Sequence, residues 1–389
     1  MSLPPTVEPG RREERFPLGA AITVDELDRD PHAALARLRQ HEPVSWLPAL
    51  RAWLVTRFDL AQVVLRDAAG FTVDDPRFST AQVVGPSMLS LDGAEHARHR
   101  DPFARGYRLD AIRARFTEAV GEDVERLLDA VEPAGKADLR RALAGPLAVS
   151  TMMRALGLDG VEPRTVLAWY EAIVSDVTAI TAGGSRTAAG ERAFEDLRRA
   201  VEPTLAGLGE TGIEVSEAVS NAAVLLFGGV ETTEAMIATA ILHVLQHPEQ
   251  QELVAADPAL LGNAVEESLL LEPAAATLDR YTTADVAVAG VSIPRGQLVS
   301  VSLAGANRDP AVFDDPDRFD VRRRNANRHL SFAQGPHVCL GMHLARLETR
   351  VALQRVLDRL PDVHLDPDRP SEVRGLVFRK PQTLDVVWS

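Results

Sequence analysis

The residues best suited to chemistry gather around the single cysteine of the chain, Cys339. They stand in the run Phe332-Ala-Gln-Gly335-Pro-His337-Val-Cys339-Leu-Gly341, just before a predicted helix. A thiolate at the start of a helix is stabilised by the helix dipole and by free backbone N–H groups. Glycine lets backbone approach a flat ligand closely, and His337 could reach an anionic group at the edge of that ligand. A cysteine alone is usually a buried, inert small residue, so the spacing of its neighbours carries the prediction.

A second group of unusual residues interrupts the longest apolar stretch, as Leu226-Phe-Gly228-Gly229-Val-Glu231-Thr232-Thr233. Two glycines, an acid and two threonines are poor choices for the interior of a buried helix. A hydroxyl group and an unwound turn could make room there for a small molecule and water. The alternative is a solvated helix face, but the apolar flanks argue against it.

Three basic side chains outside these two segments could bind an anionic ligand. His96 and Arg100 lie four residues apart, on one face of a predicted helix. Arg280 precedes a turn-like run, Val291-Ser-Ile-Pro294-Arg-Gly296. Such groups bind carboxylates by charge-assisted hydrogen bonds. Without the other motifs, they would be ordinary solvated charges.

The elements that must position these residues are mainly helical. Apolar residues at three- and four-residue spacing predict helices over 31–41, 59–67, 110–131, 137–156, 163–183, 189–208, 214–246, 258–271 and 340–358. Strand patterns occupy 51–56, 285–303 and the tail from 373. Residues 68–93 and 305–337 have the composition of loops, and an irregular stretch as long as the second needs a reason, such as wrapping around a cofactor. The predicted fold class is mainly α with a small β region.

Composition narrows the class of protein. The 389 residues carry a net charge of -14, which argues against a nucleic-acid partner. One cysteine cannot form an internal disulfide, and the polar N-terminus lacks the apolar core of a signal peptide. No run approaches the roughly 18 apolar residues of a membrane helix. We therefore expect a cytoplasmic protein with no membrane partner, and a monomer.

Together the motifs resemble the cytochrome P-450 family, whose haem-binding loop is written F-x-x-G-x-H-x-C-x-G. The resemblance covers roughly residues 15–389. It includes a meander before the loop, with Asn307-Arg-Asp-Pro, Phe313, Pro316, Phe319-Asp320 and Arg323. It implies one domain over 1–389, with 1–14 as a flexible leader, and a triangular prism of helices around a buried haem.

The resemblance also implies roles for individual residues. The cofactor would be haem b, iron protoporphyrin, with Cys339 as the axial ligand of the metal. Glu231 and Thr232 would be the catalytic pair that relays protons to iron-bound dioxygen. The other residues expected to bind the cofactor are His96, Arg100, Arg280, Phe332, His337 and Gly341.

Two positions depart from the family pattern. Ala333 stands where the family often has glycine. Leu270 stands where the family usually has the arginine of a Glu-x-x-Arg motif that begins here at Glu267. That arginine normally joins a buried ion network with the glutamate and a meander arginine. We expect Glu267 to pair directly with Arg323 instead, and the protein still to bind haem, because a buried charged network need not add net stability.

The implied function is a haem-thiolate monooxygenase that oxidises, by hydroxylation above all, a small apolar molecule of secondary metabolism. Electrons would come from a ferredoxin or similar donor with its reductase. Arginines near Cys339 could form a basic face for this partner: Arg105, Arg322, Arg346 and Arg350. Two alternatives remain, a peroxide-driven haem oxidase and a non-catalytic haem-binding protein, and the Glu231-Thr232 pair argues against both.

Substrate identity is not set by these motifs. By analogy with the family, the substrate would lie against Met88, Leu89, Val224, Gly228, Ala274 and Thr277. These side chains are mostly small and apolar, which suits a medium or large apolar molecule.

Overall fold

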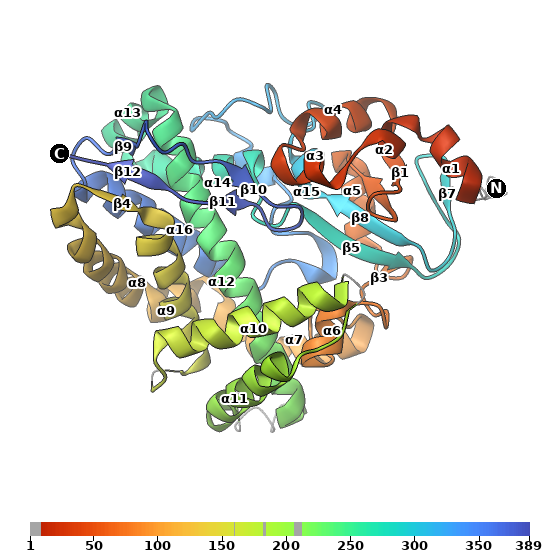
Figure 1. The fold of residues 1–389 in the computed structure, drawn as a ribbon, viewed down its shortest axis with the longest axis horizontal. Coiled ribbons are helices and arrows are strands. Elements are labelled where there is room, and N and C mark those ends of the chain that lie inside the picture. Colours follow the sequence, from red (N-terminus) through yellow and green to blue (C-terminus); the bar gives the residue numbers. More distant parts are fainter. Residues whose placement is uncertain (1–8, 159, 182–183, 206–211) are drawn as a thin grey trace.

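The structure is a computed structural model that describes residues 9–158, 160–181, 184–205 and 212–389. Figure 1 shows helices packed around one long central helix, α12, with a sheet and short helices from the N-terminal part of the chain at the opposite side from α13 and the C-terminus. The prediction of a mainly α protein with a small β region is confirmed.

Helix α12, Val215–Gln246, is the axis of the helical part. It begins with a capping box in which the Glu214 side chain accepts from the backbone of Glu217, and the Glu217 side chain accepts from the backbone N–H of Glu214. Along its length it packs on α9, α11, α14 and α16. It is apolar and long enough to cross a membrane by composition, which the sequence analysis did not foresee, but 61% of its most apolar window is buried within the protein. That burial is the behaviour of a core helix.

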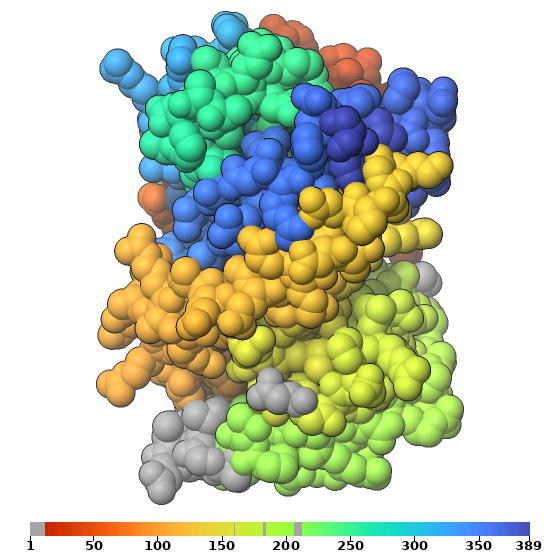
Figure 2. All heavy atoms as spheres, turned by 90° about the vertical axis from the view of Figure 1, so that its left-hand side faces the viewer, coloured from red at the N-terminus to blue at the C-terminus, as the bar shows by residue number. Residues whose placement is uncertain are grey.

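The other helices surround α12 and cover the sheet. Their bounds are α1 Pro9–Arg15, α2 Pro17–Ala21, α3 Val24–Arg29, α4 His32–His41, α5 Phe58–Arg66, α6 Ser79–Val84, α7 Gly93–Ala104, α8 Leu109–Val131, α9 Gly145–Leu156, α10 Pro163–Thr181, α11 Ala188–Leu205, α13 Pro248–Ala256, α14 Leu261–Leu271, α15 Leu303–Asn307 and α16 Met342–Arg359. In Figure 2, α8 crosses the surface beside the blue α16, and the two helices are in contact.

A mixed five-stranded sheet has the order β1-β2-β8-β5-β3, with β2 and β8 parallel and the other neighbours antiparallel. Its strands are β1 Val44–Leu47, β2 Ala52–Val55, β3 Phe71–Thr72, β5 Thr277–Thr282 and β8 Leu298–Ser302. Three smaller sheets contain β4 Lys136–Asp138, β6 Val286–Val288, β7 Val291–Ile293, β9 His364–Leu365, β10 Val373–Arg374, β11 Lys380–Pro381 and β12 Asp385–Val387. In β5, Arg280 pairs with Val299 of β8, and Asp279 pairs with Ser300. Successive side chains of a strand point to opposite faces, so the side chains of Asp279 and Arg280 lie on opposite faces of the sheet.

Several predicted boundaries need correction. The 68–93 segment is not all loop, because it contains β3 and α6. The predicted helix 137–156 begins as strand β4 and a π-helical turn, Arg140–Ala144, before α9. The strand β5 had no clear signal, since its alternation is masked by polar residues on both faces. The predicted helix ends at 182–183 and 206–208 lie outside the described residues.

Within the expected flexible leader, residues 1–14, the structure places 9–14 in helix α1. Arg12 holds this helix to the sheet: its guanidinium lies 4.7 Å from the ring centre of Trp46 and 5.4 Å from that of Trp53. Its Nη1 donates to Gln297 at 3.0 Å. Cation–π contacts of this kind favour arginine over a planar ring. Residues 1–8 of the expected leader lie outside the described part of the chain.

A buried ion cluster ties the N-terminal helices to the end of α14. Glu272 Oε1 accepts from Arg379 Nε at 2.7 Å, and its Oε2 lies 3.0 Å from His32 Nε2. Arg379 also donates to the carbonyl groups of Leu27, Asp28 and Gly375. Burial acts to raise the pKa of Glu272, but His32 and Arg379 outweigh it and lower the pKa to about 2. The ionised carboxylate therefore stabilises the folded state.

We predict that this cluster makes stability depend on acid. The folded-state pKa of Glu272 lies below its unfolded value, so its contribution is complete above about pH 5 and is lost as the pH falls towards 2. Glu272→Gln should lower the free energy of unfolding by about 3 kcal/mol at pH 7, because Arg379 stays buried without its carboxylate. The difference between the urea unfolding midpoints of wild type and Glu272→Gln, measured from pH 7 to 3, should narrow below pH 5. A gap independent of pH would contradict the assignment.

Candidate active site

The cysteine loop is held in a tight path between the meander and α16. Cys339 N donates to Phe332 O at 2.8 Å, and Ala333 N donates to Leu330 O at 2.7 Å. Gly335 has φ +75°, and a Cβ on it would lie 2.5 Å from the carbonyl oxygen of Leu65 in α5. Glycine is therefore required at 335 both by its backbone angle and by the close approach of α5.

Cys339 is exposed on the surface of its loop. Its side chain is accessible, yet burial among protein atoms is the main cause that raises its pKa. The backbone N–H groups of Gly341 and Met342, and the charges of Arg100 and Arg346, act in the other direction and favour the thiolate.

The predicted basic residues converge on this loop. The rings of His96 and His337 lie 4.2 Å apart, and His96 Nε2 is 3.2 Å from Pro336 O. Arg100 Nη2 donates to Val338 O at 2.7 Å. Both His96 and Arg100 lie on α7, one turn apart, as their spacing predicts. Burial lowers the pKa of His96, and the charges of His337 and Arg100 lower it further.

Asp92, which the sequence analysis did not select, joins this cluster. Its carboxylate accepts from His337 Nε2 at 2.8 Å, from Thr72 Oγ1 at 2.6 Å and from Val73 N at 2.9 Å. Burial opposes ionisation, but these hydrogen bonds outweigh it and hold the pKa of Asp92 well below its usual range. Its charge also acts on Arg280, which is only 5% exposed and whose pKa burial lowers. Its position just before Gly93, at the start of α7, was the one available signal.

On α12 the two glycines have different surroundings. A Cβ on Gly228 would meet no protein atom within 4 Å, whereas one on Gly229 would lie 2.2 Å from Met152 Sδ of α9. Gly229 thus permits close helix packing, and Gly228 borders open space. The expected unwound turn is absent from this segment, which α12 spans without a break. Thr232 Oγ1 instead donates to the Gly228 carbonyl at 2.5 Å, so the hydroxyl satisfies an acceptor of its own helix.

Both carboxylate oxygens of Glu231 have a bonding partner. Oε2 accepts a short hydrogen bond from the Tyr170 hydroxyl, and Oε1 lies 2.8 Å from Lys380 Nζ. Tyr170 comes from α10 and Lys380 from β11, 61 residues before Glu231 and 149 after it, respectively. Nothing in the local sequence of either residue indicated this contact.

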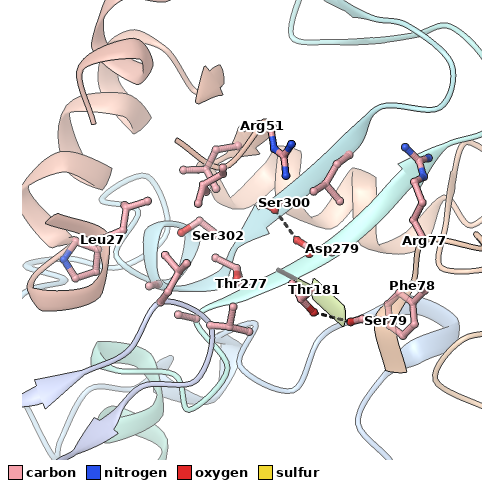
Figure 3. Close-up of a pocket in the computed structure, with 18 of the residues that line it drawn as sticks. Leu27, Arg51, Arg77, Phe78, Ser79, Thr181, Thr277, Asp279, Ser300 and Ser302 are labelled. Carbon is pink, nitrogen blue, oxygen red and sulfur yellow. Dashed lines mark hydrogen bonds between the residues drawn. The ribbon is translucent and has the colours of Figure 1, made fainter. Parts of the chain in front are cut away.

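One of the predicted substrate residues, Thr277, lines a cavity. A cavity of about 690 Å³ lies against the five-stranded sheet and includes Thr277, with Asp279, Ser300 and Ser302 on the strands and Leu27 on α3 (Figure 3). The lining of this cavity does not include Met88, Leu89, Val224, Gly228 or Ala274. Met88, Val224 and Ala274 are buried, with exposed fractions of 5%, 8% and 6%. Met88 N donates to Asn221 Oδ1 at 2.7 Å, which fastens its loop to α12.

Comparison with known proteins decides the family. The model of the family described as "Cytochrome P450" matches residues 206–383. Cytochrome P450 monooxygenase PikC of Streptomyces venezuelae is 35% identical over 87% of this chain and 85% of its own length. Nocardicin C N-oxygenase of Nocardia uniformis is 35% identical over 96% of this chain and 98% of its own. The crystal structure of CalO2 superposes with a TM-score of 0.86, at 29% identity, over 94% of this chain and 97% of that one.

The chain belongs to the cytochrome P450 family. It is therefore an oxygenating oxidoreductase whose cofactor is haem b. The residues present fit that cofactor. An accessible sulfur, basic groups from α7 and β5, and glycines at 228 and 341 where a Cβ would meet no protein atom within 4 Å together suit a flat anionic ring.

A buried ion pair joins Glu267 of α14 to Arg323 in the segment before the cysteine loop. Arg323 Nε donates to Glu267 at 2.8 and 2.9 Å, and Glu267 Oε1 also accepts from Asp320 N at 3.0 Å. The remaining nitrogens of Arg323 donate to the carbonyls of Asp314, Asp315 and Arg318. Glu267 is fully buried, and burial raises its pKa despite the opposing pull of Arg323.

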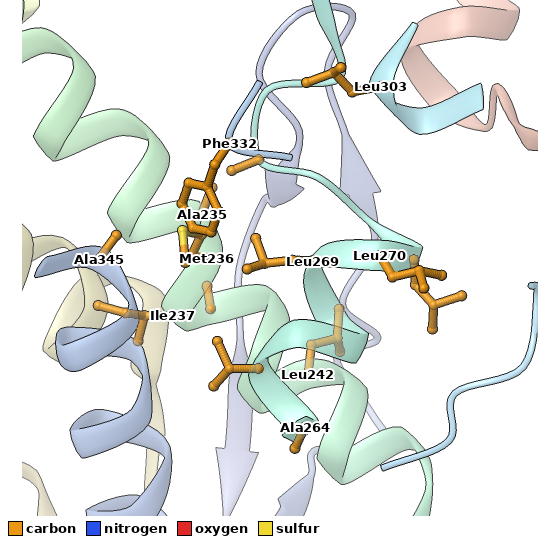
Figure 4. Packing of buried hydrophobic residues seen from close by; sticks show 14 of the residues in the cluster. Ala235, Met236, Ile237, Leu242, Ala264, Leu269, Leu270, Leu303, Phe332 and Ala345 are labelled. Carbon is orange, nitrogen blue, oxygen red and sulfur yellow. The ribbon is translucent and has the colours of Figure 1, made fainter. Parts of the chain in front are cut away.

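Leu270 completes the apolar packing beside this pair. It is fully buried within the main hydrophobic cluster, together with Leu269, Leu242 and Phe332 (Figure 4). Phe332 in turn lies under the Arg346 guanidinium, 4.4 Å from the ring centre, and Arg346 pairs with Glu266 at 2.6 Å. The direct Glu267–Arg323 pair expected from the sequence is present, and the meander's polar groups are satisfied without an arginine at 270.

We predict that restoring the family arginine destabilises this protein. Leu270→Arg would place a charge in an apolar cluster, while Arg323 and Asp320 already occupy the Glu267 oxygens. The free energy of unfolding should fall by about 2–4 kcal/mol. Leu270→Met, which conserves volume, should change it by less than about 1.5 kcal/mol. Urea unfolding of the haem-loaded proteins measures both, and a Leu270→Arg protein as stable as wild type would contradict this reading.

Ala333 offers a second stability test. Its φ of +59° lies in the left-handed region, which costs a non-glycine residue roughly 1 kcal/mol. Ala333→Gly should therefore raise the unfolding midpoint. The free energy of unfolding should rise by at most about 1 kcal/mol, because glycine also gives the unfolded chain more conformational freedom, which offsets part of the gain. The same substitution at Ala326, a buried residue in a 3₁₀ turn of the same segment, should lower the midpoint. A lower midpoint for Ala333→Gly would show that its backbone is not strained.

Proposed function

We propose that Cys339 is the axial ligand of haem iron in an oxygen-activating monooxygenase that hydroxylates an apolar organic molecule. The supporting observation is the accessible Cys339 sulfur, set at the start of α16 with two backbone N–H groups towards it and basic residues around its loop. A helix start and nearby guanidinium groups favour the thiolate that such a ligand requires.

The haem itself, when bound, supplies the oxygen chemistry, and thiolate donation favours cleavage of the O–O bond. The protein residues have narrower tasks. Arg100 and Arg280 would bind the propionates, with His96 beside them and His337 at the ring edge. Phe332 and Gly341 would border the ring. Thr232 would carry a proton once its hydroxyl leaves the Gly228 carbonyl, and Glu231 would supply the next proton.

Electrons would come from a separate ferredoxin-like donor with its reductase. An acidic donor needs a basic face, and Arg105, Arg322 and Arg350 are exposed. Arg346, expected to share this role, is instead committed to Glu266 and to the ring of Phe332. We therefore assign the docking role to the three exposed arginines.

The reaction proposed is insertion of oxygen into a substrate of secondary metabolism. Similar proteins include a vitamin D(3) 25-hydroxylase of Pseudonocardia autotrophica and a mycinamicin IV hydroxylase/epoxidase of Micromonospora griseorubida. A related structure holds a fatty acid attached to an acyl carrier protein. The lining of the cavity in Figure 3 mixes leucines with serines, threonines and charged side chains, which suits a molecule with an apolar body and polar groups.

We predict that Thr232→Ala separates reductant use from product formation. With the electron-transfer chain reconstituted, product per reductant consumed should fall about 10- to 100-fold, because a positioned proton donor is lost. Peroxide should appear in place of the missing product. Thr239→Ala, a buried threonine two turns further along α12, should keep the wild-type ratio.

Equal coupling in Thr232→Ala and wild type would remove the case for the relay. If peroxide alone then drove turnover as fast as the electron chain does, the peroxide-driven oxidase would be the better description. A protein that binds haem and consumes no reductant with any compound would instead be a non-catalytic haem binder.

A further inference from the structure

Three elements far apart in the sequence meet at Glu231. Tyr170 of α10 donates to Oε2, and Lys380 of β11 lies 2.8 Å from Oε1. Tyr170 is 8% exposed, and the side chains of Lys380 and Glu231 are 15% and 16% exposed. Two independent anchors therefore fix one carboxylate in a mostly dry place, where hydrogen bonds to charged groups are strong.

Lys380 serves a second carboxylate as well. Its Nζ lies 2.7 Å from Glu234 Oε2, and Glu234 Oε1 is 2.9 Å from Arg140 Nε in the π-helical turn. Glu231 and Glu234 lie three residues apart on one face of α12, so their charges would repel each other without a cation between them. Two carboxylates and two cations leave the group neutral, and Lys380 is the member that touches both glutamates.

Lys380 is a mostly buried lysine in a chain whose positive charges are almost all arginine. Lysine occurs only at 136 and 380. Arginine prefers to bind one carboxylate in a fork, whereas the compact ammonium of lysine has three donors that can point to separate acceptors. A cation between Oε1 of Glu231 and Oε2 of Glu234 needs donors that point to two separate carboxylates, as those of lysine do.

We propose that Lys380 and Tyr170 are positioning residues for Glu231. They hold its carboxylate in one rotamer beside Thr232, so that Glu231 can pass a proton from water towards Thr232. Lys380 and Tyr170 neither gain nor lose protons in this step. The inference rests on the proposed relay role of Glu231, and its alternative is a purely structural bridge between α10, α12 and β11.

The first test measures the contact without turnover. Lysine labelled with ¹³C and ¹⁵N gives side-chain signals from two residues, and the diamagnetic carbon monoxide-bound protein allows them to be observed. Glu231→Gln should shift the Lys380 signals and leave those of Lys136 unchanged. Lys136, exposed on β4, serves as the internal control. Lys380 signals that ignore Glu231→Gln would overturn the proposal.

The second test measures coupling. Product per reductant should fall about three- to tenfold in Lys380→Met and in Tyr170→Phe, with the substrate dissociation constant little changed. Lys380→Arg, which keeps the charge, should recover part of the loss. Lys136→Met and Glu234→Gln should stay near wild type, the latter because it removes the lysine's other partner and keeps Glu231 in place.

The outcomes separate the two claims. If Glu231→Gln itself remains fully coupled, the relay role of Glu231 fails, and the positioning role fails with it. If Glu231→Gln is uncoupled while Lys380→Met and Tyr170→Phe remain coupled at wild-type levels, only the positioning inference fails. Should Lys380→Met not fold, Tyr170→Phe, which removes one hydroxyl from a folded helix pair, decides the question in the same assay.

Discussion

The buried ion pair between Glu267 and Arg323 is the contact on which the cysteine side of the molecule depends. Arg323 donates hydrogen bonds to three carbonyl groups of the meander, and Glu267 accepts one from the backbone N–H of Asp320. One ion pair therefore fixes the backbone path of a long irregular segment. That segment leads directly into the loop that carries Cys339. A polar group left without a partner there would be costly, because the pair lies in a nearly dry interior. The apolar Leu270 is acceptable because Glu267 and Arg323 satisfy each other and the meander backbone without it.

Charge is organised differently around the cysteine loop and on α12. Around the cysteine loop, His337, Asp92 and Arg100 form contacts that also hold the loop in shape. On α12, the carboxylate of Glu231 is shared between neighbouring elements and the hydroxyl of Thr232 is bonded to its own helix. The contacts around the cysteine loop keep that loop in one conformation. The hydrogen bonds of Glu231 and Thr232 must instead be exchanged before a proton can move along them.

Much of this architecture could be predicted from sequence where the signal is local. The Cys339 loop depends on spacing within ten residues, and long amphipathic helices such as α8 and α10 carry their own periodicity. The Glu267–Arg323 pair was expected only through the family resemblance, and the contacts of Asp92, Tyr170 and Lys380, which depend on tertiary packing, were not predicted. The glycines on α12 predicted an unwound turn, but Gly229 is explained by contact with Met152, which no local pattern shows. The N-terminal helix was missed because Arg12 packs on tryptophans 34 and 41 residues away.

The central claim is that Cys339 binds haem iron as a thiolate although Leu270 replaces the usual arginine. The absorption spectrum of the purified, haem-loaded protein, reduced and exposed to carbon monoxide, tests it most directly. We expect the band that gives the family its name, stable over time, and its loss in Cys339→Ser. A wild-type spectrum typical of haem without a bound thiolate, or a protein that stays colourless after haem is supplied, would contradict it.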